Sequence, residues 1–245
     1  KALRAKVCEI FTDVKGIYTT DPRIEPKAKK IKLITFEEML EMASLGAQVM
    51  QARSIEVAKR YNIPIHVRSS FSKEEGTMIV KKNEKMEEIA VRGVTCNRSE
   101  AKITICAVPD QTGIAAKIFT DISRMDVNVD MIVQNVSHTK LTDISFTVSR
   151  SDLPRATQAA KAVAQKIHAG EVLFDKRIAR VSVVGSGMRS HHGIAAKMFQ
   201  VLAENKINID MISTSEISIS CIINQRHVEK AVRCLHQRFG LEALA

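Results

Sequence analysis

Residues 112–132 read TGIAAKIFTDISRMDVNVDMI, and residues 192–212, eighty positions later, read HGIAAKMFQVLAENKINIDMI. Ten of the twenty-one aligned positions are identical: Gly113/Gly193, the four residues IAAK that follow, Phe119/Phe199, Asn128/Asn208 and the closing DMI. Self-similarity at a fixed spacing indicates a repeated structural unit. The chain therefore contains two copies of one module.

Each copy alternates between strand-like and helix-like segments. An apolar run with a period of two predicts a first strand at 102–108 and 180–184. A glycine-containing loop and a helix with one apolar stripe follow. The stripe consists of Ile114, Ile118, Ile122 and Met125 in the first copy, and of Ile194, Met198 and Leu202 in the second. Two more strands (129–134 and 143–148; 209–213 and 217–223) and a second helix (153–167; 226–239, with Asn224 as its N-cap) complete each pattern.

The fourth strand of the module distinguishes the two copies. The first copy ends in a short strand at 171–174, whereas no strand follows residue 239 in the second. An otherwise unassigned strand, IAVRGVT at 89–95, lies upstream of the first copy. Because an unpaired sheet edge is a liability, we expect this strand to complete the second sheet. The predicted fold class is α+β, with two interlaced ferredoxin-like βαββαβ modules whose helices cover one face of an antiparallel sheet.

Residues 1–80 follow a different pattern. A strand at 7–12, a turn-rich loop at 13–31, a long helix running from a capping box at Thr35 and Glu38 toward Tyr61, and a strand at 63–67 predict part of an α/β domain. Linkers are expected at 72–76 and 81–88. The expected domains are 1–80, a partial α/β domain; 81–98, a linker and the interlacing strand; 99–176, the first module; and 177–245, the second.

Composition excludes several classes of protein. The net charge is +10, but aromatic residues make up 4%, Trp is absent, and no basic stretch is interleaved with aromatic rings, so a solvated basic surface is favoured over nucleic-acid binding. No apolar run approaches the ~20 residues of a membrane-spanning helix. Five scattered cysteines without a C-x-x-C pair indicate reduced thiols, a cytoplasmic location and no metal site. The first residue is Lys1, without a signal peptide, from which we expect a partial chain.

Several motifs resemble the aspartate kinase family along the whole chain. The stretch FTDVKGIYTTDPR at 11–23 is similar to that family's nucleotide-site loop. FEEMLEMASLGA at 36–47, with QARS at 51–54, resembles the helix that follows this loop in the family. IPIHVRSSF at 63–71 resembles the end of the kinase domain. In the repeats, VQNVS at 133–137, GMRS at 187–190 and MISTSE at 211–216 resemble the kinases that respond to lysine and threonine. The resemblance implies a partial amino-acid-kinase domain followed by two interlaced ACT modules.

The resemblance also implies a nucleotide site. Its expected residues are Thr12, Asp13, Tyr18, Asp21, Pro22 and Arg23, with Gln48 at the place of a family lysine. An arginine suits phosphate oxygens, whereas an amide supplies no charge. The alternative is that 12–23 is only a polar turn region. The family's N-terminal Lys-Phe-Gly-Gly segment and aspartate-binding residues have no counterpart here, so we expect no catalytic residue and no activity in this chain alone.

Two effector sites are expected at the helix N-termini that follow Gly113 and Gly193. Free N–H groups there favour a ligand carboxylate, and a glycine allows close approach. Asp110 suits the ammonium group of a free amino acid, and Gln134 suits a hydroxyl or amine on the side chain of that amino acid. The expected residues are Asp110, Thr112, Gly113, Ile114 and Gln134 in the first module, and Met188, Ser190, Gly193, Asn208, Ile209 and Asp210 in the second. The alternative is that the glycines only serve tight turns and the aspartates only cap helices.

By resemblance, the whole enzyme uses Mg-ATP to convert L-aspartate to 4-phospho-L-aspartate, the first step toward lysine, threonine and methionine. Lysine and threonine inhibit it by feedback, and ACT modules pair side by side with effectors between them, so at least a dimer is expected. No metal is expected in the modules, and His191 and His192 are interpreted as surface residues. The rival interpretation is a non-catalytic small subunit or a stand-alone amino-acid-binding protein, whose start codon would precede Met86.

Overall fold

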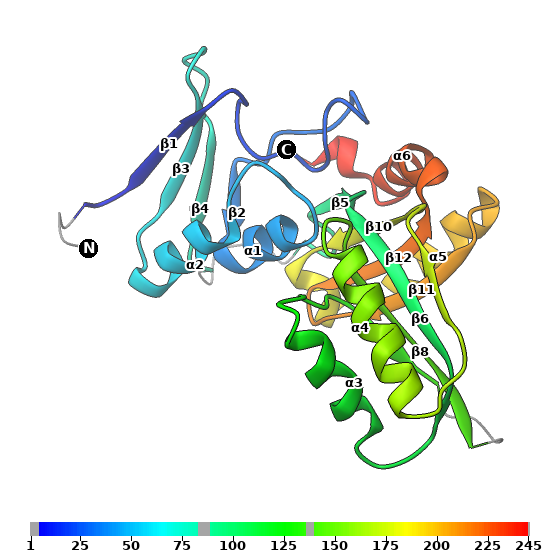
Figure 1. Cartoon of the computed structure of the whole chain (residues 1–245). Helices are drawn as coiled ribbons and strands as arrows, with labels where there is room; N and C mark the ends of the chain where they lie inside the picture. Colours follow the sequence, from blue (N-terminus) through cyan, green and yellow to red (C-terminus); the bar gives the residue numbers. More distant parts are fainter. Residues whose placement is uncertain (1–4, 83–88, 136–139, 245) are drawn as a thin grey trace. The chain divides into compact units, whose positions relative to one another are not determined.

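The computed structural model describes residues 5–82, 89–135 and 140–244. The chain divides into two compact units, one formed by Lys1–Asn97 with Arg180–Ala245 and the other by Arg98–Ala179 (Figure 1). Most of the linker expected at 81–88, and Val136 and Ser137 of the motif at 133–137, lie outside the described residues. Within the described ranges, no helix is long and apolar enough to cross a membrane.

A four-stranded sheet organises the N-terminal segment, residues 5–82. Its strands β1 (Cys8–Thr12), β3 (Ile65–Ser69), β4 (Thr77–Val80) and β2 (Leu33–Thr35) lie in that order, with α1 (Phe36–Ser44) and α2 (Ala52–Tyr61) packed beside them. The β1–β3 and β2–β4 pairs are parallel, and β3–β4 is antiparallel. The sheet is therefore mixed, and its short strands β2 and β4 were not anticipated.

The long helix expected from Thr35 to Tyr61 is wrong, because α1 and α2 are separate. The capping box itself is present, with Thr35 and Glu38 bonding reciprocally. The chain leaves the first helix at Gly46, whose φ of +114° favours glycine and whose added Cβ would lie 2.3 Å from the Cys96 carbonyl oxygen. The linker expected at 72–76 is also wrong. It is the turn of the β3–β4 hairpin, in which Val67 is paired with Thr77.

The second module shares a unit with the N-terminal segment. It contains β10 (Ile178–Val184), η1 (Ser186–Arg189), α5 (Ile194–Glu204), β11 (Ile209–Thr214), β12 (Ser218–Asn224), η2 (Gln225–His227), α6 (Val228–Arg238) and η3 (Leu241–Ala243). Its sheet order is β11-β12-β10-β5, and β5 (Gly93–Asn97) pairs antiparallel with β10 from Gly93↔Val184 to Asn97↔Arg180. The interlacing is confirmed, although the strand lies a few residues later than 89–95.

The first module forms the other unit. Its elements are β6 (Glu100–Pro109), α3 (Ile114–Ser123), β7 (Ile132–Gln134), β8 (Leu141–Ser149), α4 (Leu153–Lys166) and β9 (Val172–Asp175), with sheet order β7-β8-β6-β9. Helices α3 and α4 lie side by side (Figure 1). Ile118, Ile122 and Phe146 are fully buried between helices and sheet. Met125 is not on the buried stripe, because α3 ends at Ser123 and Asp126 turns the chain with φ +53°.

Candidate nucleotide and effector sites

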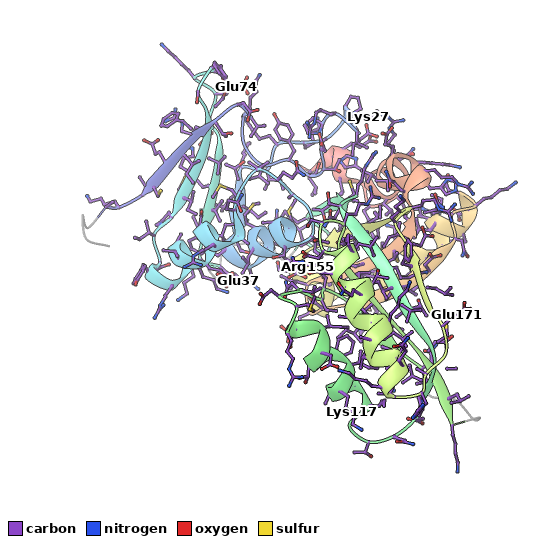
Figure 2. The ribbon with its side chains drawn as sticks, viewed as in Figure 1. Lys27, Glu37, Glu74, Lys117, Arg155 and Glu171 are labelled. Carbon is purple, nitrogen blue, oxygen red and sulfur yellow. The ribbon has the colours of Figure 1, made fainter. Side chains whose placement is uncertain are left out.

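The loop between β1 and β2 is bonded to the sheet through Thr77 of β4. The Thr77 hydroxyl accepts a hydrogen bond from the Ile17 N–H at 2.8 Å and donates one to the Ile31 carbonyl at 2.5 Å. At the hairpin tip, Glu74 (Figure 2) pairs with Lys15 at 2.5 Å and with Lys30 at 3.3 Å. The loop that carries most of the expected nucleotide residues is therefore tied to the sheet by both neutral and charged bonds.

The expected nucleotide residues lie at the end of β1 and along this loop. The Thr12 hydroxyl donates to the Asp13 carboxylate at 3.0 Å, and Tyr18 forms a β-bridge with Lys30. Arg23 and Asp21 form an ion pair through the arginine Nε (3.0 Å) and Nη2 (2.7 Å). The Arg23 side chain is nevertheless 85% exposed, so it remains accessible to an anion. Pro22 is exposed, and Gln48 lies exposed in the connection between α1 and α2.

The same loop contacts helix α6 of the second module. The buried Thr19 hydroxyl lies 2.9 Å from His236 Nε2, and Arg233 donates to the Ile24 carbonyl at 2.8 Å. Burial lowers the pKa of His236, although Glu25 and Glu242 oppose that shift. No sequence pattern indicated this contact, because Thr19 and His236 are 217 positions apart.

The two repeated helices begin in the same unusual way. Gly113 and Gly193 both have φ +86°, and neither helix α3 nor α5 has a side-chain cap. A Cβ added at either glycine would meet no atom within 4 Å. The positive φ, rather than a crowded approach in the free protein, explains why glycine stands there. The side of each glycine on which a Cβ would stand is therefore open and leaves room for a ligand, although the Ile114 N–H already donates to the Gln111 carbonyl at 3.1 Å.

The other first-module residues lie around this helix start. Strands β6 and β7 both run antiparallel to β8, so their C-terminal ends lie at the same end of the sheet. Asp110 follows β6 there and its N–H bonds to the Lys140 carbonyl at 2.9 Å, and Gln134 ends β7. Asp110, Thr112 and Gln134 are exposed, whereas Ile114 is buried. The structure thus brings the expected first-module residues to one end of the module.

The second module separates its expected residues into two groups. Met188 and Ser190 precede α5 in a tight turn, in which the Ser190 hydroxyl donates to the Gly187 carbonyl at 3.2 Å. Asn208, Ile209 and Asp210 follow the other end of α5, an 11-residue helix, which spans about 16 Å. Thr214 corresponds to Gln134 at the eighty-residue spacing and ends β11. It lies at the same end of the sheet as the tight turn, because the Gly185 N–H bonds to the Ile217 carbonyl in the β11–β12 connection. One copy of this module does not gather all six expected residues.

A buried carboxylate links the second-module turn to helix α1. Glu38 Oε1 accepts hydrogen bonds from the Ser186 N–H (3.1 Å) and hydroxyl (2.8 Å), and Oε2 accepts from Thr35. Burial raises the pKa of the Glu38 carboxyl, but the Arg92 guanidinium at 3.6 Å and the bonds from Ser186 and Thr35 outweigh it and leave that pKa below its ordinary value. The carboxylate is therefore ionised although its side chain is fully buried.

Metal ligands do not gather in the part of the chain that the structure describes. No group of three or more His, Cys, Asp or Glu side chains there could hold an ion. His191 Nδ1 lies 2.8 Å from the Gly187 carbonyl, and the side chains of His191 and His192 are exposed.

Family models match three parts of the chain. Residues 1–69 match the amino acid kinase family, and residues 102–165 and 181–239 each match the ACT domain. The ligand-free regulatory subunit of aspartate kinase from Thermus thermophilus is 40% identical, with a TM-score of 0.59 over 61% of this chain and 99% of that one. The chain belongs to the aspartate kinase family.

Longer aspartate kinases are also similar. The enzyme of Pseudomonas putida is 51% identical over all 245 residues, and the chain spans 60% of its length. Aspartokinase III of Escherichia coli, solved with lysine and aspartate in a T-state, is 28% identical with a TM-score of 0.74 over 97% of this chain and 53% of that one. Another structure of that enzyme holds aspartate and ADP in an R-state, with a TM-score of 0.79. This aspartate kinase chain therefore carries an amino acid kinase segment and two ACT domains.

Proposed function

We propose that this chain is the feedback-regulatory region of an aspartate kinase whose effectors are lysine and threonine. The observation that carries the proposal is the matched pair of uncapped helix starts at Gly113 and Gly193, each with open space beside the glycine. A free amino acid offers a carboxylate for such a helix start and an ammonium for a nearby acidic side chain. Asp110 supplies that side chain in the first module, where the second has Ser190.

The effector sites are proposed to form between paired modules. Met188 and Ser190 lie at one end of α5, and Asn208 and Asp210 follow its other end. A site that used both groups would need two modules side by side, each contributing one end. This arrangement requires at least a dimer of this chain, or a complex with a longer kinase chain, located in the cytoplasm. Domain boundaries at 1–80, 81–98, 99–176 and 177–245 belong to the same proposal.

The N-terminal segment is proposed to bind the nucleotide side of Mg-ATP. The exposed Arg23 fits a phosphate, and the loop around it is held rigidly by Thr77. Mg-ATP would supply the phosphoryl group that the whole enzyme transfers to the side-chain carboxylate of L-aspartate. Gln48 gives the site a neutral amide where a cation would neutralise phosphate charge. The contribution of this chain is therefore to position the nucleotide loop.

Calorimetric titration tests the effector proposal. Lysine and threonine are titrated into the chain singly and then each in the presence of the other, with D-lysine and glycine as controls. We expect saturable binding of the L-amino acids and none of D-lysine. Absence of binding by both lysine and threonine would refute the effector assignment.

A second candidate function is a non-catalytic regulatory subunit. It is favoured by the Thermus thermophilus regulatory subunit, of which this chain covers 99%. The coding sequence distinguishes the two functions, because an in-frame Lys-Phe-Gly-Gly segment upstream supports the enzyme. A start codon just before Met86, which lies outside the described residues, supports the subunit.

A further inference from the structure

The two modules differ in the bonds made near the end of their first strands, at Cys106 inside β6 and at Ser186 just after β10. Ser186 of the second module corresponds to Cys106 of the first at the eighty-residue spacing of the repeat. Cys106 bonds through its backbone to Gly170 and Glu171, within its own module. Ser186 bonds instead to Glu38, at the start of a helix of the kinase segment. In the second copy this position is therefore bonded to helix α1 of the kinase segment.

The Glu38 carboxylate holds three segments together. It accepts two hydrogen bonds from Ser186 and two from Thr35, and it faces the Arg92 guanidinium in the strand connection before β5. A fully buried ionised group keeps its position only while such partners remain, since leaving it unpaired is strongly unfavourable. A displacement of Ser186 must therefore be followed by α1 or leave the carboxylate short of a donor.

The loop that carries Ser186 is tightly connected to the candidate effector residues. Ser186 precedes Met188 by two positions and Ser190 by four. Between them, the Gly187 N–H bonds to the Ile89 carbonyl at 3.1 Å, and the Gly187 carbonyl accepts from the Ser190 hydroxyl and lies 2.8 Å from His191 Nδ1. A ligand that repositions Ser190 would thus act on Gly187 and, through one peptide unit, on Ser186.

We propose that Glu38 is a positioning residue that transmits effector binding at the second ACT module to helix α1 of the kinase segment. The proposal rests on the effector function proposed above. Helix α1 leads into the connection that holds Gln48, so its first turn is a direct route from the regulatory module to the nucleotide half of the enzyme. The route begins in the second module, so the amino acid that binds there acts through Glu38.

Hydrogen exchange of the α1 amide protons tests the proposal on the 245-residue chain. Exchange is measured without ligand, with saturating L-lysine and with saturating L-threonine, and calorimetry records binding in parallel. In the wild-type chain, one of the two amino acids should change exchange in α1 by about five-fold or more, the lower end of ordinary coupling between sites. In Ser186→Ala and Glu38→Gln, the change should fall below about two-fold while calorimetry still shows binding.

A matched control lies one helical turn further along α1. Among the described residues, Glu41 accepts side-chain hydrogen bonds from Ser215 (3.0 Å) and Ser218 (2.6 Å) of the same module, which lie in the β11–β12 connection and at the start of β12. Glu41→Gln should keep the five-fold response. Ser186→Ala removes one hydroxyl and keeps the backbone bond to Glu38, so it tests the proposal even if Glu38→Gln does not fold.

The outcomes separate this proposal from the function on which it rests. If neither amino acid binds, the effector function itself fails. If an amino acid binds but α1 does not respond in the wild-type chain, only the role of Glu38 is overturned. A response that persists in Ser186→Ala, or that is lost equally in Glu41→Gln, also overturns it.

Discussion

The substitutions Gly113→Ala and Gly193→Ala should lower the stability of the chain by equal amounts, but each should weaken the binding of a different ligand. Gly113 and Gly193 share φ +86°, and a Cβ at either position meets no atom within 4 Å. The only cost in the free protein is then the left-handed backbone, about 1–2 kcal/mol for a residue with a Cβ. At about 2–4 °C per kcal/mol for a chain of this size, each variant should lower Tm by about 2–8 °C.

Ligand binding distinguishes the two variants. The new methyl group would occupy the open space beside each glycine, where we place the effector carboxylate. Gly113→Ala should lower the affinity for one amino acid about ten-fold or more, equivalent to about 1.4 kcal/mol of binding free energy. Gly193→Ala should lower the affinity for the other amino acid by a similar factor. Thermal unfolding and calorimetric titration of both variants with lysine and threonine measure the two effects separately.

Gly76→Ala provides the contrasting control. Its Cβ would lie 1.8 Å from the Val67 carbonyl oxygen, so the β3–β4 hairpin would have to move and a much larger loss of stability is expected. Wild-type affinity for both amino acids in Gly113→Ala and Gly193→Ala would show that no carboxylate sits at these helix starts. A loss of stability as large as that of Gly76→Ala would show that the space around them is not open.

Three further predictions concern activity, specificity and pH. The chain alone should show no ATP-dependent phosphorylation of aspartate, and turnover above a no-enzyme control in a coupled assay would contradict this. Asp110→Ala should weaken one effector by about 1–3 kcal/mol, the range for a hydrogen bond to a charged group, and the other much less; equal losses in calorimetry would mean that the site is misplaced. Because burial lowers the pKa of His236, the unfolded state binds the proton more readily, so stability should fall as pH drops below about 6.5. Urea unfolding from pH 7.5 to 5.5 should show this fall, and a slope unchanged in His236→Gln would remove His236 as its cause.

Local patterns predicted the repeated modules well. The eighty-residue repeat, the buried positions Ile118 and Phe146, and the capping box at Thr35 all depend on neighbouring residues and on periodicity. The interlaced strand was also predictable, because one copy of the module lacked a fourth strand. Its pairing with β10 is confirmed in the structure.

Features that depend on distant contacts were not predictable. Helix α1 ends near Gly46 because the chain there packs against the Cys96 carbonyl, fifty positions away. Glu38 has a local role that the sequence indicates, but its bonds to Ser186 join residues 148 positions apart. In the same way, the division of the second-module residues between the two ends of α5 follows from sheet topology, which a list of residue types does not contain.

The strand β5 has a consequence for the order in which the chain folds during synthesis. Residues 93–97 leave the ribosome before the first module, yet their partner strand β10 ends at Val184. At about 5–20 residues per second, this strand remains without its partner for roughly 5–20 s while the whole first module is made. The first module can complete its own sheet in that interval, whereas the sheet of the second module forms only when β10 pairs with a strand that was synthesised earlier. Deleting the residues before Arg98 should therefore leave the first module folded and the second prone to aggregation along the exposed edge of β10.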